Sequence, residues 1–476
     1  MDRNTSTHHP KVLPFLFLTE MWERFGFYVV QGLLVLYMTE HFGFSDVVSD
    51  TISGTFMGLV YISPFVGGYL ADKVLGFKVS ILWGGLFLVL GYALLAFSST
   101  TALFYPSLAV IICGNGLFKP NISSLLGTQY APHDPRRDSG FTIFYIGINL
   151  GSALSGASGY IKSLYGWNVT FSLASIGMII GVFAFLSGAK HLHGLKPFPP
   201  KRRPFIFRFL FYCLLIIAGL SFLLKMHAVA NYLLPGTGII LLIFLTGLTL
   251  MQTPEYRKRM ILLNILIISS IVFWTLFLQI FISANLFVER LVEKNLFGIP
   301  LTTTVFYASE AVFIILLGPF FAWSWDALGR NRMNPSPITK FTLGIFFAGL
   351  AFVILSISTS FINDSGLINP LWVFFAYLVI TIGELLLSPI GLSAITQLAP
   401  PHLTGMMMGI WFVATGFGGI FAGMLAKMAS IPEAIQTNAE KLSIYQDAFL
   451  NYAYLAFVVA IFLFFLHITF KKWLRE

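Results

Sequence analysis

Long apolar segments separated by short polar stretches make up most of this sequence. Each has roughly the 20 apolar residues that a helix needs to cross the hydrocarbon core of a bilayer. Only helices and closed barrels satisfy all their backbone groups in lipid, so the pattern predicts an all-α polytopic membrane protein. We expect fourteen transmembrane helices, at about 14–40, 50–73, 79–98, 101–129, 139–164, 168–189, 205–225, 230–251, 258–288, 301–325, 339–361, 369–398, 403–429 and 446–470.

The first apolar segment is unusual because it carries charged side chains. Glu20, Glu23 and Arg24 lie within a run that begins near Leu13. At 100° per residue they share a helical face with Tyr28, whereas the opposite face is apolar. Placing one such charge at the centre of a bilayer costs about 2.5 to 3.5 kcal/mol on insertion scales. The pattern favours a polar site on a substrate or proton path; the alternative is a charged cluster that reaches the membrane surface from the helix end.

Composition and charge agree with a membrane protein. The chain is 57% hydrophobic and only 10% charged, whereas a soluble domain has about 25% charged residues. Lys and Arg concentrate in alternate polar stretches, and the positive-inside rule then places both termini in the cytoplasm. The net charge of +9 therefore reflects topology, and nucleic acid is not an expected partner. Cys113 and Cys213 lie in apolar segments, so we expect neither a disulfide framework nor a metal site.

Two similar polar turns indicate an internal duplication. One is GGYLADKVLG, which ends at Gly76, and the other is FAWSWDALGR, which ends at Arg330. Repeats at corresponding positions of two halves are typical of secondary transporters. We therefore predict an N-terminal six-helix bundle at 1–190, an inserted helical hairpin with its linkers at 191–255, and a C-terminal six-helix bundle at 256–476.

Several motifs carry a resemblance to a known family. GGYLADKVLG resembles the loop motif of the major facilitator superfamily. Within that superfamily the chain is similar to the proton-dependent oligopeptide transporter (POT/PTR) family. The stretches that carry this likeness are EMWERFGFY, GNGLFKPN, FTIFYIGINLGSAL, GELLLSPIGLSAITQLAP and GMMMGIWFVATGFGG. They occur in order from Glu20 to about residue 424, and their combination is far more specific than any one of them.

This resemblance implies a fold and a function. It implies the major facilitator fold, with two six-helix halves and an inserted two-helix hairpin. It also implies a symporter that moves di- and tripeptides together with protons by alternating access. We accordingly expect no enzymatic activity and no cofactor, with protons as the coupling ion. The expected setting is the lipid bilayer of a bacterial inner membrane, with the protein functional as a monomer.

Two ionisable residues have chemical uses that follow from their surroundings. Lys119 is a cation in an apolar segment, which implies a carboxylate partner, either Glu20 or Glu23 or a substrate carboxylate. Glu384 lies in a wholly apolar run, where a lone acid can carry a proton or, when ionised, attract a substrate ammonium group. The alternatives are a structural ion pair for Lys119 and a structural hydrogen bond for Glu384.

The resemblance assigns further substrate contacts. It implies that Arg24 and Lys119 bind the peptide carboxyl end and that Glu384 binds the amino end. It also implies that Tyr28, Tyr61 and Asn149 hydrogen-bond the peptide backbone, and that Trp411 lines a side-chain pocket. For Tyr61 and Trp411, ordinary helix packing is the favoured alternative when each is considered alone.

The sequence departs from the family pattern near the expected outer gate. Gln31 and Leu278 stand where many members have an Arg and a Glu that pair with each other. Loss of one partner would leave a buried charge at a cost of about 3 to 5 kcal/mol, whereas loss of both can be nearly neutral. We therefore expect neutral contacts to hold this gate. Phe27 also replaces a frequent Tyr, which removes one hydroxyl group.

A second departure adds an acid. Glu310 and Ala311 stand where the family usually has Asn and Pro. Glu310 is a candidate replacement for the missing acid, or a second acid beside Glu384 that strengthens capture of an ammonium group. Two neighbouring carboxyl groups would share a proton at neutral pH. The alternative is that Glu310 faces a polar vestibule and does neither. The candidate proton-coupling residues are Glu20, Glu23, Glu310 and Glu384.

Three other functions remain open on the sequence. The first is a transporter of the same fold for an amino acid, nitrate or a drug, with altered proton coupling. The second is an intramembrane enzyme that uses buried carboxylates, but the sequence contains no evident nucleophile–base pair or HExxH motif. The third is a transport-like nutrient sensor, which would be expected to carry a signalling tail.

Overall fold

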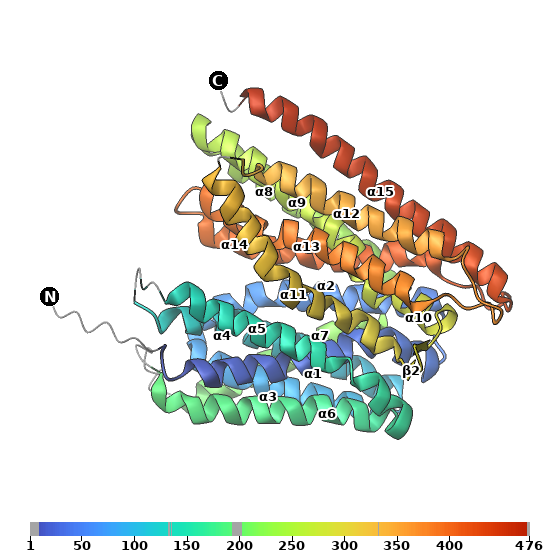
Figure 1. Cartoon of the computed structure of the whole chain (residues 1–476). Helices are drawn as coiled ribbons and strands as arrows, with labels where there is room; N and C mark the ends of the chain where they lie inside the picture. The colour runs from blue at the N-terminus through green and yellow to red at the C-terminus, as the bar shows by residue number, and fades with distance from the viewer. Residues whose placement is uncertain (1–8, 132–133, 135, 193–201, 332, 474–476) are drawn as a thin grey trace. The chain divides into compact units, whose positions relative to one another are not determined.

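The computed structural model describes residues 9–131, 134, 136–192, 202–331 and 333–473, and these are almost entirely helical (Figure 1). The α-helices are α1 (Leu13–Glu40), α2 (Asp46–Leu70), α3 (Phe77–Ala96), α4 (Thr101–Thr128), α5 (Arg137–Ser155), α6 (Ser158–Gly188), α7 (Arg202–Lys225), α8 (His227–Leu250), α9 (Pro254–Phe277), α10 (Ser283–Leu291), α11 (Thr303–Arg330), α12 (Pro337–Ser358), α13 (Pro370–Leu398), α14 (Thr404–Ala426) and α15 (Asn438–Trp473). Shorter elements are η1 (Ala71–Leu75), η2 (Ala189–His191), η3 (Leu278–Phe281), η4 (Lys427–Ala429), and the antiparallel strands β1 (Asn295–Leu296) and β2 (Ile299–Pro300).

Helices occur at all of the predicted apolar segments, with one informative difference in a boundary. The predicted fifth and sixth segments, 139–164 and 168–189, meet near Gly166, but α5 already ends at Ser155. At Gly166 the backbone is left-handed (φ 79°). Glycine adopts this conformation without steric cost. The helix α6 nevertheless begins before that point, at Ser158, so the chain runs helically on both sides of the break.

Twelve segments of the described chain are long and apolar enough to cross a membrane. The two predicted segments outside this set correspond to α1 and α5. Both form helices at the expected positions, but their charged and polar residues lower their hydropathy. In α1 these residues include Glu20, Glu23 and Arg24. The structure therefore shows an all-α polytopic membrane protein with twelve candidate spans, against the fourteen that the sequence predicts.

The chain divides into two compact units, and two helices are shared between them. Unit 1 comprises Met1–Gln31 and Ile62–Lys225, and unit 2 comprises Gly32–Tyr61 and Met226–Glu476. The division cuts α1 after Gln31 and α2 after Tyr61. One half of each of these helices therefore packs with the second half of the sequence.

In unit 1, the helices approach closely at glycines. The helix α3 packs on α4 and α6, and α7 packs on α4. A Cβ atom on Gly67 of α2 would overlap the backbone of Gly116 on α4. A Cβ atom on Gly84 of α3 would come within 2.7 Å of the Phe118 backbone nitrogen. Small residues permit such backbone contact between membrane helices, and this packing fixes α4 against its neighbours.

In unit 2, α12 packs between α13 and α15, and α9 packs against α14 (Figure 1). The first-half segment Gly32–Tyr61 joins this unit through another glycine contact. A Cβ atom on Gly54 of α2 would lie 2.7 Å from the backbone nitrogen of Gly423 on α14, and one on Gly58 would lie 2.9 Å from the Gly416 carbonyl oxygen. The backbones of α2 and α14 are therefore in direct contact.

The two helices of the predicted inserted hairpin pack on different units. Phe209 of α7 contacts Trp83 of α3 with ring centroids 5.8 Å apart, within unit 1. Gly238 of α8 packs against the Phe417 ring of α14, within unit 2. The preceding linker, at 193–201, lies outside the described residues, as do the N-terminal residues 1–8 and Arg332, just after the second repeated turn.

Candidate functional site

The predicted charged face of α1 forms a compact network in unit 1. Arg24 donates from Nε to Glu23 Oε2 (2.5 Å) and from Nη2 to Glu23 Oε1 (2.6 Å). The same Nε lies 3.7 Å from Glu20 Oε1. The guanidinium carbon lies 4.5 Å from the centroid of the Phe27 ring, so the residue that replaces a frequent Tyr makes a cation–π contact. A two-point bond between Arg and a carboxylate fixes both groups in position.

The helix α4 supplies the other half of the network. Lys119 forms an ion pair with Glu20, which confirms the prediction that this cation has a carboxylate partner. Asn115, one helical turn earlier, accepts from Arg24 Nη2 at its Oδ1 atom (3.1 Å). Asn115 was not singled out by the sequence analysis, although its i, i+4 spacing from Lys119 places both side chains on one face of α4.

These four ionisable residues, Glu20, Glu23, Arg24 and Lys119, form what we call the α1–α4 quartet. Its formal charges cancel, which lowers the cost of burying them. Glu20 and Glu23 are fully buried. The Arg24 side chain is 6% exposed, but the Lys119 side chain is 28% exposed. Lys119 is therefore the cation of the quartet that an incoming anion reaches first.

Glu20 is only partly satisfied in this arrangement. Its Oε2 atom is buried and has no hydrogen-bond partner among the described residues. An ionised carboxylate in that position lacks the donors that normally compensate burial.

The other predicted contacts of unit 1 lie outside the quartet's ion pairs. Tyr28 is partly buried and packs edge-on against Phe27, with ring centroids 5.5 Å apart. Asn149 on α5 donates to the Tyr145 carbonyl oxygen of its own helix (3.0 Å). A Cβ atom on Gly151 would lie 3.0 Å from the Arg24 Cβ atom, so α5 packs closely on α1 at the quartet.

In unit 2, Glu310 of α11 and Glu384 of α13 lie together. A side-chain hydrogen bond joins their carboxyl groups, and we call them the α11–α13 carboxyl pair. Glu310 is 5% exposed, and Glu384 Oε2 is buried without a hydrogen-bond partner among the described residues. A carboxylate only accepts hydrogen bonds, so a bond between two carboxyl groups requires a proton on one of them. The structure thus places the carboxyl groups of Glu310 and Glu384 side by side, as the second of the sequence-based alternatives expects.

Trp411 and Tyr61 also lie in unit 2, apart from the hydrogen bond between Glu310 and Glu384. Trp411 is 3% exposed, contacts Phe341 edge-on with centroids 6.2 Å apart, and occupies the space that a Cβ atom on Gly391 would need. These contacts pack α14 against α12 and α13. Tyr61 is partly buried at the end of the α2 segment that belongs to unit 2.

The two departures expected at the outer gate, Gln31 and Leu278, are both buried and uncharged, and neutral side chains make the nearby hydrogen bonds described here. Gln31 is buried, and neither atom of its amide has a hydrogen-bond partner among the described residues. Gln279 donates to the Ala422 carbonyl oxygen (2.9 Å) and accepts from Ser283 (2.6 Å). Asn285 donates to the Gly32 carbonyl oxygen (2.6 Å).

An ion pair at another position joins the α2 segment to α10. Arg290 donates from Nη1 and Nη2 to the two carboxylate oxygens of Asp46, at 2.6 and 2.7 Å. The sequence analysis missed this pair because the residues are 244 positions apart and both lie at segment ends. The only sequence signal was the pair of acids, Asp46 and Asp50, at the start of the second apolar segment.

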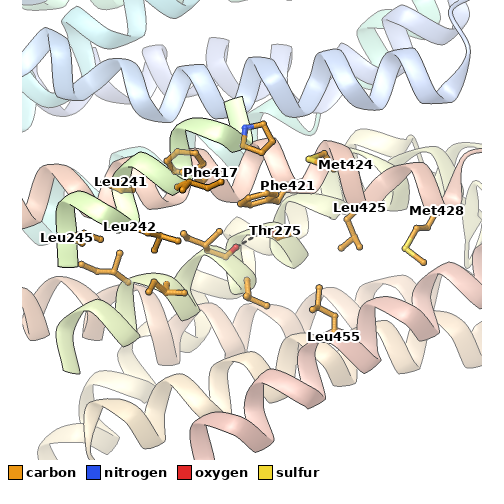
Figure 2. Close-up of a pocket in the computed structure, with 17 residues that line it drawn as sticks. Leu241, Leu242, Leu245, Thr275, Phe417, Phe421, Met424, Leu425, Met428 and Leu455 are labelled. Carbon is orange, nitrogen blue, oxygen red and sulfur yellow. Dashed lines mark hydrogen bonds between the residues drawn. The ribbon is translucent and has the colours of Figure 1, made fainter. Parts of the chain in front are cut away.

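A separate pocket in unit 2 has the wrong chemistry for a charged substrate. This cavity of about 590 Å³ lies among α8, α9, α14 and α15 (Figure 2). Its lining is apolar apart from Thr275, whose hydroxyl donates to the Ile271 carbonyl oxygen of its own helix (2.8 Å). A zwitterionic ligand would find no compensating charge there. The ionised clusters, rather than this pocket, are the candidate functional site.

Comparison with known proteins identifies the family. The model of the POT family (PTR2) matches residues 78–442. This chain belongs to the POT family. The family comprises proton-dependent oligopeptide transporters of the major facilitator superfamily, and its members are permeases, not enzymes.

Individual POT relatives match nearly the whole chain. Dipeptide and tripeptide permease A of Erwinia pyrifoliae is 36% identical over 457 residues, which cover 95% of this chain and 92% of that protein. The protein of the same name from Escherichia coli K12 is 34% identical over 457 residues, with 95% and 91% covered. The crystal structure of a peptide transporter POT in complex with sulfate has a TM-score of 0.85 and 31% identity, and covers 99% of this chain and 97% of that one.

Proposed function

We propose that this chain is a proton-coupled symporter of di- and tripeptides that works by alternating access. The relatives from Erwinia pyrifoliae and Escherichia coli are both named dipeptide and tripeptide permease A. A similar solved structure shows a mutant peptide transporter POT in complex with alafosfalin. The observation on this chain that carries the proposal is the α1–α4 quartet. Its formal charges cancel, and its more accessible cation, Lys119, is paired with the buried carboxyl group of Glu20.

The quartet suits a substrate carboxyl group. When Glu20 takes up a proton, its attraction for Lys119 falls, and the ammonium group can bind the peptide carboxylate instead. Arg24 stays bonded to Glu23 and Asn115, so it positions the site and adds positive potential at the same end of the peptide. Proton uptake at Glu20 or Glu23 and peptide binding therefore favour each other, which is the linkage that symport requires.

The α11–α13 carboxyl pair suits a substrate ammonium group. No cation among the described residues forms an ion pair with Glu310 or Glu384, so one negative charge remains when the two carboxyl groups share a single proton. An ammonium group supplies both the missing charge and hydrogen-bond donors for Glu384 Oε2. We assign Glu384 to the peptide amino end and Glu310 to holding the shared proton.

The remaining assignments complete the proposal. Tyr28, Tyr61 and Asn149 hydrogen-bond the peptide backbone, and Trp411 lines a side-chain pocket. We propose fourteen membrane crossings, including α1 and α5, with both termini in the cytoplasm of a bacterial cell. The bundles at 1–190 and 256–476 and the insert at 191–255 form a protein that works as a monomer in the inner membrane.

Uptake into proteoliposomes tests this function. Liposomes that contain the purified chain are given a labelled dipeptide with and without an imposed inward proton gradient. We expect gradient-dependent accumulation of intact dipeptide, competed by unlabelled di- and tripeptides but not by free amino acids or nitrate. Accumulation that is competed equally by free amino acids would contradict the peptide assignment, and recovery of hydrolysed label alone would contradict transport.

A further inference from the structure

The contact of the α2 segment with the second half of the sequence contains an acid that the proposed mechanism does not use. We call this contact the α2 seam, and define it by Asp46, Asp50 and Gly54 on α2, Arg290 on α10, and Gly423 with Ser430 at the end of α14. All six belong to unit 2. Asp46 and Asp50 are one helical turn apart, so they project from the same side of α2.

Asp46 is fully compensated. Both of its carboxylate oxygens accept from Arg290, and Oδ2 also accepts from the backbone nitrogen of Ile431 (2.9 Å). Arg290 also donates to the Tyr445 hydroxyl (3.4 Å). The one arginine of the seam is therefore committed to Asp46.

Asp50 is not compensated. It is 1% exposed, its Oδ1 atom is buried without a hydrogen-bond partner among the described residues, and its Oδ2 atom shares a hydrogen bond with the neutral Ser430 hydroxyl (3.0 Å). The other titratable groups that face Asp50 are Asp46, Arg290, Lys427, Tyr445 and Tyr452. Asp46 repels a second negative charge, and burying an ionised carboxylate without donors is costly.

The α2 and α14 backbones are in direct contact at the level of Asp50, which is 1% exposed. A Cβ atom on Gly423 would lie 2.6 Å from the Asp50 carbonyl oxygen and 2.8 Å from the Gly54 Cα atom. The two backbones therefore touch directly beside the carboxyl group. Separation of α2 from α14 would hydrate Asp50, and hydration favours the ionised form.

We propose that Asp50 is a further proton-binding site of this transporter, occupied while the α2 seam is closed and emptied to water when it opens. The inference rests on the proposed function for its link to transport. The step is a simple transfer: the carboxyl O–H bond breaks, and the proton passes to water as the seam parts. Because the proton is bound more tightly in the closed arrangement, protonation favours closure, and a low pH on the side to which the seam opens favours reloading.

Infrared spectroscopy of the purified full chain tests the site without any transport measurement. At neutral pH we expect a C=O stretching band of a protonated carboxyl group, shifted in heavy water, that is lost in Asp50→Asn. The matched control is Asp364→Asn, which removes an exposed loop acid and should leave the band intact. Ser430→Ala, which removes the hydrogen bond to Asp50, should shift the band. An unchanged spectrum in both Asp50→Asn and Ser430→Ala would overturn the site.

Proton–peptide stoichiometry then tests the coupling. In proteoliposomes we expect Asp50→Asn to carry fewer protons per dipeptide than the wild type and Asp364→Asn, while dipeptide exchange without a gradient persists. Loss of the infrared band with an unchanged stoichiometry would overturn the coupling role. A wild-type chain that transports no dipeptide would refute the proposed function, whereas the infrared result on Asp50 would stand by itself.

Discussion

The α1–α4 quartet and the α11–α13 carboxyl pair are both buried ionisable clusters, but they solve the cost of burial differently. In the quartet, each acid has a base: Glu23 is bonded to Arg24 and Glu20 to Lys119. In the pair, Glu310 and Glu384 bond each other, and no cation among the described residues forms an ion pair with either. In a cluster of ion pairs, the opposite charges offset the cost of burial. In a cluster of two acids, burial is favourable only while a proton neutralises one of the carboxyl groups.

Under the proposed function, this difference gives the two clusters different roles in substrate binding. A cluster with a releasable cation suits an anionic group of the substrate, and a cluster with an excess acid suits a cationic group. The seam acids repeat the contrast at a smaller scale, since Asp46 has an arginine and Asp50 has none. Unpaired acids are therefore the positions at which proton binding and shape can be linked.

The largest expected effect comes from removing the cation of the quartet. Lys119→Met removes the nearest cation from the buried Glu20 and leaves its longer contact with Arg24 Nε (3.7 Å), so we expect the free energy of unfolding to fall by about 3 kcal/mol. Dipeptide uptake should fall at least about tenfold, because a hydrogen bond to a charged group contributes about 1.5 to 3 kcal/mol. Thermal unfolding in detergent and proteoliposome uptake measure the two effects.

A double variant separates stability from binding in the quartet. Lys119→Met combined with Glu20→Gln removes both charges, so we expect thermal stability to return towards the wild type while uptake stays low. Normal uptake by the double variant would show that Lys119 has only a structural role.

A more selective effect is expected at the carboxyl pair. Glu310→Gln keeps a hydrogen-bonding side chain beside Glu384 but removes the shared titratable proton. We expect accumulation driven by a pH gradient to be lost, while exchange of peptide across the membrane continues. Ser309→Ala is the matched control on the same helix, because its hydroxyl bonds only the Phe306 carbonyl oxygen in the described contacts (2.6 Å). Unchanged gradient-driven uptake in Glu310→Gln would remove this residue from the coupling account.

The smallest effect is expected at the ion pair of Asp134 and Arg136, between α4 and α5. Hydrogen bonds from the Arg136 side chain lower the pKa of Asp134 to about 2. Because this lies below the unfolded value of about 3.9, the contribution to stability is present above that value and is lost as the pH falls towards 2. Asp134→Asn should therefore leave the profile of uptake unchanged between about pH 5 and 8. A shifted profile would show that this loop takes part in proton coupling.

Much of the candidate site could be predicted from local patterns. Burying a charged residue in an apolar segment costs free energy, so the positions of Lys119, Glu20 and Glu384 alone marked them as candidates. The need for a carboxylate beside Lys119 followed from the same cost. Asn115 and Arg290 were not recognised, since a neutral amide and a charge at a segment end are common and need no special partner.

The sequence by itself determined the class of the protein, the positions of its helices and the presence of ions where lipid forbids them, because hydropathy acts residue by residue. The tertiary structure alone decided which ionisable side chains contact each other. It gave Asp46 an arginine and left Asp50 without one, and it joined Glu310 to Glu384 across two helices. It also divided α1 and α2 between two units. These outcomes depend on how helices far apart in the chain pack, and the energy of a buried charge is set by those neighbours rather than by its own sequence.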